Sequence, residues 1–301
     1  MPQLATLSPS HPESTRAVTR VAPWQRGLLA LALLELLALF APTVLWLFDR
    51  WTMSVWQHAH GLLIPPVVAY FAYQALVPLR GLPASSSPWG FAFLIPALLL
   101  HALDAGIHTQ LLSAVALLLA LPGLSLLLLG VPRTRAIAFP LAFLAFALPI
   151  PLTFTERIHW ELRQIAVAGT STIVPWFGIP IFVEGTTLHT AQGALEVADA
   201  CSGFSTLYAA IAVAALTAYS TPVLGRRVLV LLAAAPLAIF ANLLRVATLV
   251  ILVVWRGEDI LETFIHPLSG MATFALALPI IFWLGGDPSP APRRPSETAA
   301  E

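Results

Sequence analysis

The sequence has 301 residues, of which 58% are hydrophobic and only 10% are charged, a balance that excludes an ordinary soluble globular domain. Basic and acidic residues number 15 each, and this zero net charge argues against nucleic acid as a partner. A single cysteine excludes an internal disulfide framework. Apolar runs long enough to cross a bilayer recur along the chain, so we predict a polytopic helical membrane protein in contact with lipid.

Polar segments at both ends bound one apolar region. Residues 1–23 are rich in Ser, Thr and Pro, and residues 287–301 in Pro, Ser, Arg and Glu, so we predict two flexible tails. Between them, residues 24–286 form a single integral membrane domain. A cleavable signal peptide is the alternative for the first apolar run. However, the run from Gly27 to Phe48 is too long for a signal core and lacks a clear small-residue cleavage site.

The apolar runs predict an all-α polytopic fold with about eight transmembrane helices. In chain order the predicted spans are 24–48, 62–79, 88–105, 109–130, 135–151, 201–220, 227–250 and 267–284. No internal repeat is evident among them.

The region before the sixth predicted span differs from the others. The stretch from Thr155 to Trp176 places apolar Ile158, Leu162 and Ile165 beside charged residues, a spacing that predicts an outward-facing helix lying at the membrane interface. A ninth span over residues 164–183 is the alternative, but several glycines and prolines weaken it.

Short extended pieces are predicted next. Residues 181–183 and 195–197 are the clearest of them, and turns are expected at Glu184-Gly185 and Gln192-Gly193. These pieces lead the chain to Cys201 at the outer surface.

The arginines predict the orientation, because positively charged loops stay on the cytoplasmic side. An inward N-terminus puts both termini in the cytoplasm and leaves only Arg50, Arg157, Arg163 and Arg256 outside. The arginines then inside are Arg16, Arg20, Arg26, Arg80, Arg133, Arg135, Arg226, Arg227, Arg293 and Arg294.

Three chemically active residues converge in this topology. Cys201 is the first residue of the sixth predicted span, and His266 lies where the last span begins on the outer side. Arg245 is 18 residues from Arg227, a rise of about 27 Å against a hydrocarbon core about 30 Å thick. All three therefore fall at similar depth near the outer face.

A thiol, an imidazole and a guanidinium suit acyl transfer. The thiolate attacks a carbonyl, the imidazole moves the proton, and the guanidinium stabilises the developing oxyanion. Each residue also has an ordinary role: Cys201 in packing, Arg245 as a snorkelling side chain, His266 as an interfacial cap. Their common depth favours a site, because ionisable groups inside membrane proteins are usually functional.

Weaker candidates surround this triad. Asp199 orients His266 or meets Arg245, or else it only caps the sixth span. Asn242 holds the guanidinium or a substrate amide, or packs between helices. His60 lines the substrate entrance or terminates the outer loop. We expect no cofactor and no metal, although His101, Asp104 and His108 could share a helical face, because the helix is short there and Gly106 interrupts it.

Several motifs together resemble the exosortase/archaeosortase family of membrane cysteine transpeptidases. The resemblance covers roughly residues 45–285 in consistent order. Its motifs are Ala200-Cys201-Ser202-Gly203, Asn242-Leu243-Leu244-Arg245, His266-Pro267-Leu268-Ser269-Gly270, Gly178-Ile179-Pro180-Ile181, Glu184-Gly185, Leu195-Glu196-Val197 and His60-Gly61-Leu62-Leu63-Ile64-Pro65-Pro66.

The resemblance implies Cys201 as nucleophile, with Arg245 and His266 completing the triad and Ser202 and Gly203 supporting it. It implies an enzyme of the bacterial cytoplasmic (inner) membrane with its active site facing the periplasm or exterior. Its substrates would be membrane-anchored exported proteins with a C-terminal sorting signal: a Pro-Glu-Pro-type (PEP-CTERM-like) motif, one transmembrane helix and a basic tail. Such enzymes are common in bacteria that export polysaccharide.

One departure concerns the subfamily. Many bacterial members carry a basic residue soon after Cys-Ser-Gly, whereas Phe204-Ser205-Thr206 follows here.

Two functions of other classes stay open. One is a transport or export component for exopolysaccharide or surface proteins, which would need a polar pathway across the bilayer. The other is an assembly scaffold without catalysis, which would tolerate substitution of the triad.

Overall fold

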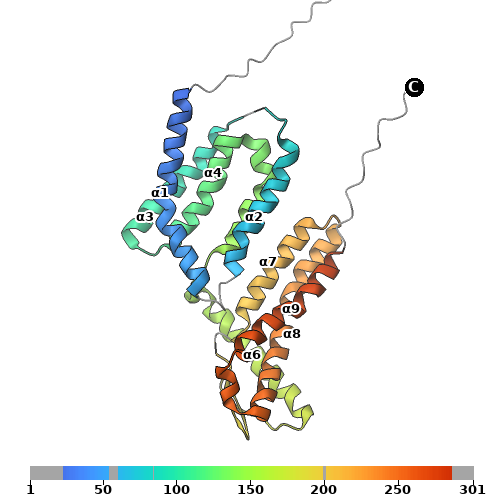
Figure 1. Ribbon diagram of the computed structural model, residues 1–301. Coiled ribbons are helices and arrows are strands. Elements are labelled where there is room, and N and C mark those ends of the chain that lie inside the picture. The colour runs from blue at the N-terminus through green and yellow to red at the C-terminus, as the bar shows by residue number, and fades with distance from the viewer. Residues whose placement is uncertain (1–22, 54–59, 84, 199–200, 287–301) are drawn as a thin grey trace, which may run out of the picture. The chain divides into compact units, whose positions relative to one another are not determined.

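Figure 1 shows the computed structural model of the chain, which describes residues 23–53, 60–83, 85–198 and 201–286. The chain divides into two compact units, residues 1–42 and 43–301. Within the described residues, the first unit consists of part of helix α1 (Pro23–Met53). The second unit contains the rest of the described elements.

The prediction of an all-α polytopic membrane protein is confirmed. Six helices in the described ranges are long and apolar enough to cross a membrane, and all six overlap predicted spans. Their apolar segments are Leu29–Thr52, His60–Leu79, Pro88–Ile107, Leu111–Ala136, Leu224–Arg256 and Leu268–Gly285. The count of eight spans stays a prediction, because the two other predicted spans correspond to shorter apolar helices, Ala138–Ala147 and Phe204–Ser220.

The first helices of the second unit form short hairpins. After α1 come α2 (His60–Leu76), η1 (Val77–Leu79), η2 (Pro88–Gly90), α3 (Phe91–Ile107) and α4 (Leu111–Ala136). Helices α3 and α4 pack against each other, and the buried carboxylate of Asp104 joins them. It accepts the backbone N–H of Thr109 at 3.0 Å and that of Ser113 at 3.1 Å. Asp104 thereby caps the first turn of α4, which accounts for an acid in this apolar hairpin.

The predicted span 135–151 is a broken helix. It contains α5 (Ala138–Phe143) and η3 (Leu144–Ala147), and residues 148–151 are not helical. Ten helical residues rise only about 15–17 Å, roughly half of the hydrocarbon thickness. Side chains of other helices donate to carbonyls near the end of this helix: Trp51 Nε1 donates to Ala147 O at 2.8 Å and Tyr208 Oη to Ala145 O at 3.4 Å, an oxygen that also accepts the backbone N–H of Leu148 at 3.1 Å. Such partners make irregular backbone tolerable inside a membrane protein.

The predicted interfacial helix and extended pieces are present as α6 and a small sheet. Helix α6 spans Leu152–Ile173 and continues into η4 (Val174–Phe177). Three antiparallel strands follow in the order β1 (Phe182–Glu184), β2 (Thr187–Thr190) and β3 (Gly193–Glu196). The connections fall at both turns that the sequence predicts. That α6 lies at the membrane interface stays a prediction.

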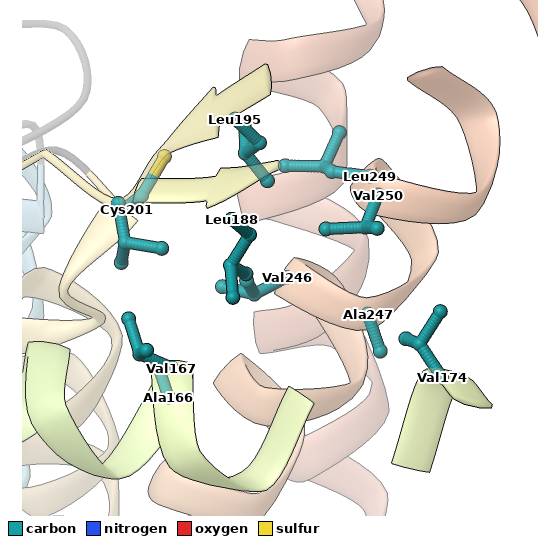
Figure 2. Packing of buried hydrophobic residues seen from close by; sticks show 11 residues of the cluster. Ala166, Val167, Val174, Leu188, Leu195, Cys201, Val246, Ala247, Leu249 and Val250 are labelled. Atoms are coloured by element: carbon teal, nitrogen blue, oxygen red, sulfur yellow. The ribbon is translucent and has the colours of Figure 1, made fainter. Parts of the chain in front are cut away.

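The sheet packs onto α6 and α8 through a buried apolar cluster (Figure 2). Leu188 of β2 and Leu195 of β3 face the same side, because they are paired across the strands. Cys201 belongs to this cluster and is only 2% exposed. Its full set of buried members is Ala166, Val167, Val174, Leu188, Leu195, Val197, Cys201, Val246, Ala247, Leu249 and Val250.

The last three α-helices in the described residues form a bundle, in which α7, α8 and α9 run side by side (Figure 1). They are α7 (Phe204–Ser220), α8 (Leu224–Arg256) and α9 (Ile265–Gly285), with η6 (Glu258–Glu262) between the last two. Small side chains fill the contact between the helices, among them Ala210 and Ala214 of α7 and Ala234 and Ala238 of α8. Small residues allow close approach of helix backbones, which is how helices associate where water does not drive them together.

Candidate active site

Cys201 lies in a tight turn immediately before α7. Its backbone N–H donates to Ala198 O at 2.9 Å, and Gly203 closes the turn with a φ of 84°. The Oγ of Ser202 accepts the N–H of Phe204 at 3.3 Å and so caps the start of α7. Cys201 and Ser202 are almost completely buried, at 2% and 1% exposure. The predicted candidate Asp199 lies outside the described residues.

Asn242 holds this turn from α8. Its Nδ2 donates to Cys201 O at 3.2 Å and to Ser202 O at 3.1 Å. Because two carbonyl oxygens face the same atom, that atom must be the amide nitrogen, which settles the orientation of the side chain. Asn242 is 3% exposed. The sequence left open whether Asn242 holds the guanidinium or a substrate amide, or packs between helices. In the structure its amide binds the backbone of the Cys-Ser-Gly turn, and its role in the site stays a prediction.

Gly203 fits the turn for two reasons. Its positive φ is rarely adopted by residues with a side chain. In addition, a Cβ at this position would lie 2.7 Å from Asn242 Nδ2 and 2.8 Å from Asn242 Cβ, which is too close for packing. The Cys-Ser-Gly motif and the Asn-Leu-Leu-Arg motif therefore depend on each other in space.

Arg245 is one helical turn beyond Asn242 and points to the same region. Its guanidinium is 8% exposed, and its Nε donates to Ser269 Oγ at 3.0 Å. A Cβ on Gly270 would lie only 3.6–3.8 Å from the guanidinium atoms, so α9 passes directly beside this group. Ser269 and Gly270 thus form the part of α9 that receives the arginine.

His266 stands at the beginning of α9, one turn before Ser269 and Gly270. Its backbone is helical, but its side chain lies outside the described part of the structure. The structure therefore brings the segment that carries His266 to Arg245 through the contacts of Ser269 and Gly270. The role of the imidazole stays a prediction.

Two opposing effects set the acidity of the thiol. Burial raises the pKa of Cys201, because the thiolate is poorly solvated inside the protein, and the positive charge of Arg245 lowers that pKa in part. Burial is the larger effect, so the pKa stays above its ordinary value. The resting thiol is therefore protonated at neutral pH, and a base must take its proton before it can attack a carbonyl.

His60 is the first residue of α2 and contacts α7 farther along the chain than Cys201. Its ring is 5.1 Å from the ring of Tyr208, which is seven positions after Cys201. Tyr208 also contacts Phe146 and Phe204, with ring centroids at 5.5 Å and 6.1 Å. The structure thus connects His60 to the start of α7 through Tyr208. A role at the substrate entrance stays a prediction.

A second histidine, which sequence reasoning missed, contacts the turn directly. His159 of α6 is 7% exposed, and its Nδ1 lies 2.9 Å from Ser202 Oγ. It shares one face of α6 with Thr155, Leu162 and Ala166, which are also buried. Small and polar residues at helical spacing are typical of the protein-facing side of a helix in a membrane protein. This spacing is the sequence signal that could have identified His159.

These contacts place a buried thiol, a cation and hydrogen-bonding groups in one region. Nucleophilic acyl transfer uses groups of these kinds. Among the described residues, no group of three or more His, Cys, Asp or Glu side chains is placed to hold a metal ion.

Comparison with known proteins gives one match. A family model described as transmembrane exosortase matches residues 51–283, most of the chain, and its range contains every site residue named above. No curated protein and no solved structure matches the chain.

Proposed function

Because the chain belongs to the transmembrane exosortase family, which implies a membrane cysteine transpeptidase in general, we propose a specific reaction for it. The protein cleaves the C-terminal sorting signal of exported, membrane-anchored proteins. Cys201 is the nucleophile, Arg245 stabilises the oxyanion, and His266 is the general acid and base. The signals are of the PEP-CTERM type.

The observation that carries this proposal is the position of Arg245. It is a buried cation whose charge acts on the Cys201 thiol and whose guanidinium is held by Ser269. A fixed cation at that point costs no reorganisation when negative charge develops on a nearby carbonyl oxygen, and it acts strongly where water is excluded. A packing cysteine needs no such neighbour.

The proposed reaction has two steps. His266 accepts the thiol proton, and the Cys201 sulfur attacks the scissile carbonyl carbon to give a tetrahedral oxyanion beside Arg245. The C–N bond then breaks, the leaving amine takes the proton from His266, and a thioester remains on Cys201. Water or an amine then attacks the thioester carbon and gives its proton to His266. The C–S bond breaks, and the departing sulfur takes the proton from His266 to regenerate the thiol.

The location of the site follows from the charge distribution. The ten-to-four division of arginines supports cytoplasmic termini and a site near the outer face of the bacterial inner membrane. At that depth the natural substrate is a chain already anchored in the bilayer. Ser202, Gly203 and Asn242 support the turn that carries the nucleophile, and Asp199 and His60 remain weaker candidates for substrate contact.

The test uses full-length protein in membranes and a reporter whose C-terminus carries a Pro-Glu-Pro motif, a transmembrane helix and a basic tail. We expect the wild type to shorten the reporter. Cys201→Ala, Arg245→Gln and His266→Ala should leave it uncleaved. Natural substrates of the host provide a second reporter if the short motif differs between subfamilies.

Thr248→Val is the matched control for the substitution on α8. Thr248 is exposed, one turn after Arg245, and its hydroxyl bonds only to the carbonyl of Leu244 on its own helix among the contacts described, at 2.8 Å. This variant should cleave normally. Cleavage that survives Cys201→Ala would refute the proposal, and a transport or scaffold role would then account better for the protein.

A further inference from the structure

Packing alone does not account for the surroundings of His159, because its imidazole makes a polar contact with the turn that carries Cys201. It lies on α6, 42 residues before Cys201 in the sequence, yet its Nδ1 is 2.9 Å from the Oγ of Ser202. Its ring also packs on that of Phe204, with centroids 4.6 Å apart. One side chain of α6 therefore contacts the residues one and three positions after Cys201.

The hydroxyl of Ser202 connects the start of α7 with α6. It accepts the backbone N–H of Phe204 at the start of α7, and it bonds to the imidazole of α6. Asn242 of α8 meanwhile binds the carbonyls of Cys201 and Ser202. The nucleophile turn is thus held on its backbone by α8 and on its serine side chain by α6.

We propose that His159 is a positioning residue of the proposed transpeptidase reaction. Through its hydrogen bond to Ser202 it fixes the turn that aims the Cys201 thiol at the scissile carbonyl. For the effect of His159 on turnover, the proposal rests on the proposed function. The effect of His159 on the position of the thiol does not depend on any substrate.

The physical reason is the sensitivity of nucleophilic attack to geometry. A nucleophile displaced by about 1 Å loses roughly 100-fold in rate. Cys201 stands in a short turn that includes a left-handed glycine, and the contacts of His159 from α6 and of Asn242 from α8 are among those that restrain this turn. A hydrogen bond of 2.9 Å between buried groups supplies such a restraint.

Two substitutions of His159 separate the hydrogen bond from the ring. Asn carries a polar atom as many bonds from Cα as Nδ1 of histidine, so His159→Asn can keep the bond to Ser202 but loses the ring. His159→Phe keeps a ring to pack on Phe204 but loses the bond. Ser202→Ala removes the bond from the other side without touching α6.

The experiment measures turnover of the reporter in membranes that contain full-length variants. We expect kcat to fall about 10- to 100-fold in His159→Phe and in Ser202→Ala, with KM nearly unchanged. The double variant should be no slower than the worse single one, because both remove the same interaction. His159→Asn should recover most of the wild-type kcat.

A histidine that also has a ring contact and a polar contact, but a partly exposed side chain, provides the control. His189 of β2 has a ring contact with Phe182, at 6.1 Å, and a polar contact with Glu184, at 3.4 Å, but it lies on the sheet. His189→Phe should leave kcat unchanged. The amount of each variant in the membrane, and labelling of Cys201 after denaturation, show whether the protein has accumulated with its thiol intact.

A second readout needs no substrate. A released turn exposes its thiol more often, so alkylation of Cys201 should become about tenfold faster in His159→Phe and Ser202→Ala. Equal kcat in the wild type and these two variants would overturn the proposal, as would equal losses in His159→Asn and His159→Phe. Reporter cleavage by Cys201→Ala would instead refute the proposed function, and alkylation would then decide the positioning role by itself.

Discussion

The fit of Gly203 against Asn242 provides the sharpest test of the described geometry. The perturbation is Gly203→Ala, which adds a single methyl group. That methyl group meets two obstacles: the backbone has a φ of 84°, and the Asn242 side chain occupies the space at 2.7–2.8 Å.

The magnitude follows from these two obstacles. A left-handed conformation costs a residue with a Cβ about 1–2 kcal/mol. Overpacking of a buried site costs about 1–3 kcal/mol more. Together Gly203→Ala should lower the free energy of unfolding by about 2–5 kcal/mol.

Gly178→Ala is the matched control. Gly178 has nearly the same φ, 77°, but a Cβ there would meet nothing within 4 Å. Only the conformational cost of about 1–2 kcal/mol should remain. Combining Gly203→Ala with Asn242→Ala should relieve part of the crowding, because the second change removes Cγ and Nδ2 of Asn242 while its Cβ stays.

The assay is unfolding in mixed detergent micelles, followed together with alkylation of Cys201, the only thiol in the chain. Gly203→Ala should accelerate alkylation more than Gly178→Ala does, and the Asn242→Ala background should reduce the extra cost of Gly203→Ala by about 1–3 kcal/mol. Equal losses of stability for the two glycine variants would refute the reasoning, because they would mean that Asn242 does not crowd the turn.

Three further predictions use other contacts of the site and its scaffold. Arg245→Gln removes the charge that lowers the pKa of Cys201, so this pKa should rise further. The pH profile of Cys201 alkylation should then shift to higher pH, and Arg245→Lys should shift this profile less. Ser269→Ala deprives Arg245 Nε of its acceptor at 3.0 Å, and kcat for the reporter should fall about tenfold with little change in KM; an unchanged kcat would show that Ser269 does not orient the guanidinium. Trp51→Phe leaves the carbonyl of Ala147 without its donor at 2.8 Å, which should cost about 1–3 kcal/mol in thermal or detergent unfolding, and an unaltered stability would count against the proposed support of the broken helix.

Much of the fold was predictable because the bilayer restricts the possible structures. Long apolar runs must be helical when no water can satisfy their backbone groups. The six long helices therefore agree with the predicted spans. Turn residues such as Glu184-Gly185 also predicted the strand connections. The broken helix of residues 138–147 escaped prediction because its apolar composition resembles that of a span. Pro149 marks its end in the sequence, and contacts with Trp51 and Tyr208 supply donors to its last carbonyls.

The candidate site was predictable only in part. Cys201 and Arg245 could be predicted from their depth in the membrane and their residue types. Asn242 could be predicted because it lies one turn before Arg245. His159 was not predicted, because Ile158 and Ile165 indicated a different face of α6 as the buried one. In the structure those two isoleucines are 45% exposed, while His159 and Leu162 are buried. In a membrane protein, apolar side chains can face outward, and the smaller and more polar residues pack inside.

The order of residues by itself determined that this chain is a polytopic membrane protein with one thiol and separate Asn-Leu-Leu-Arg and His-Pro-Leu-Ser-Gly segments. Periodicity and hydropathy are local properties, so they can be read along one chain. Which side chains meet is decided by how helices rotate and pack against one another, and no local pattern carries that information. Only the tertiary structure therefore placed Asn242 beneath Gly203, Arg245 against Ser269, and His159 on Ser202.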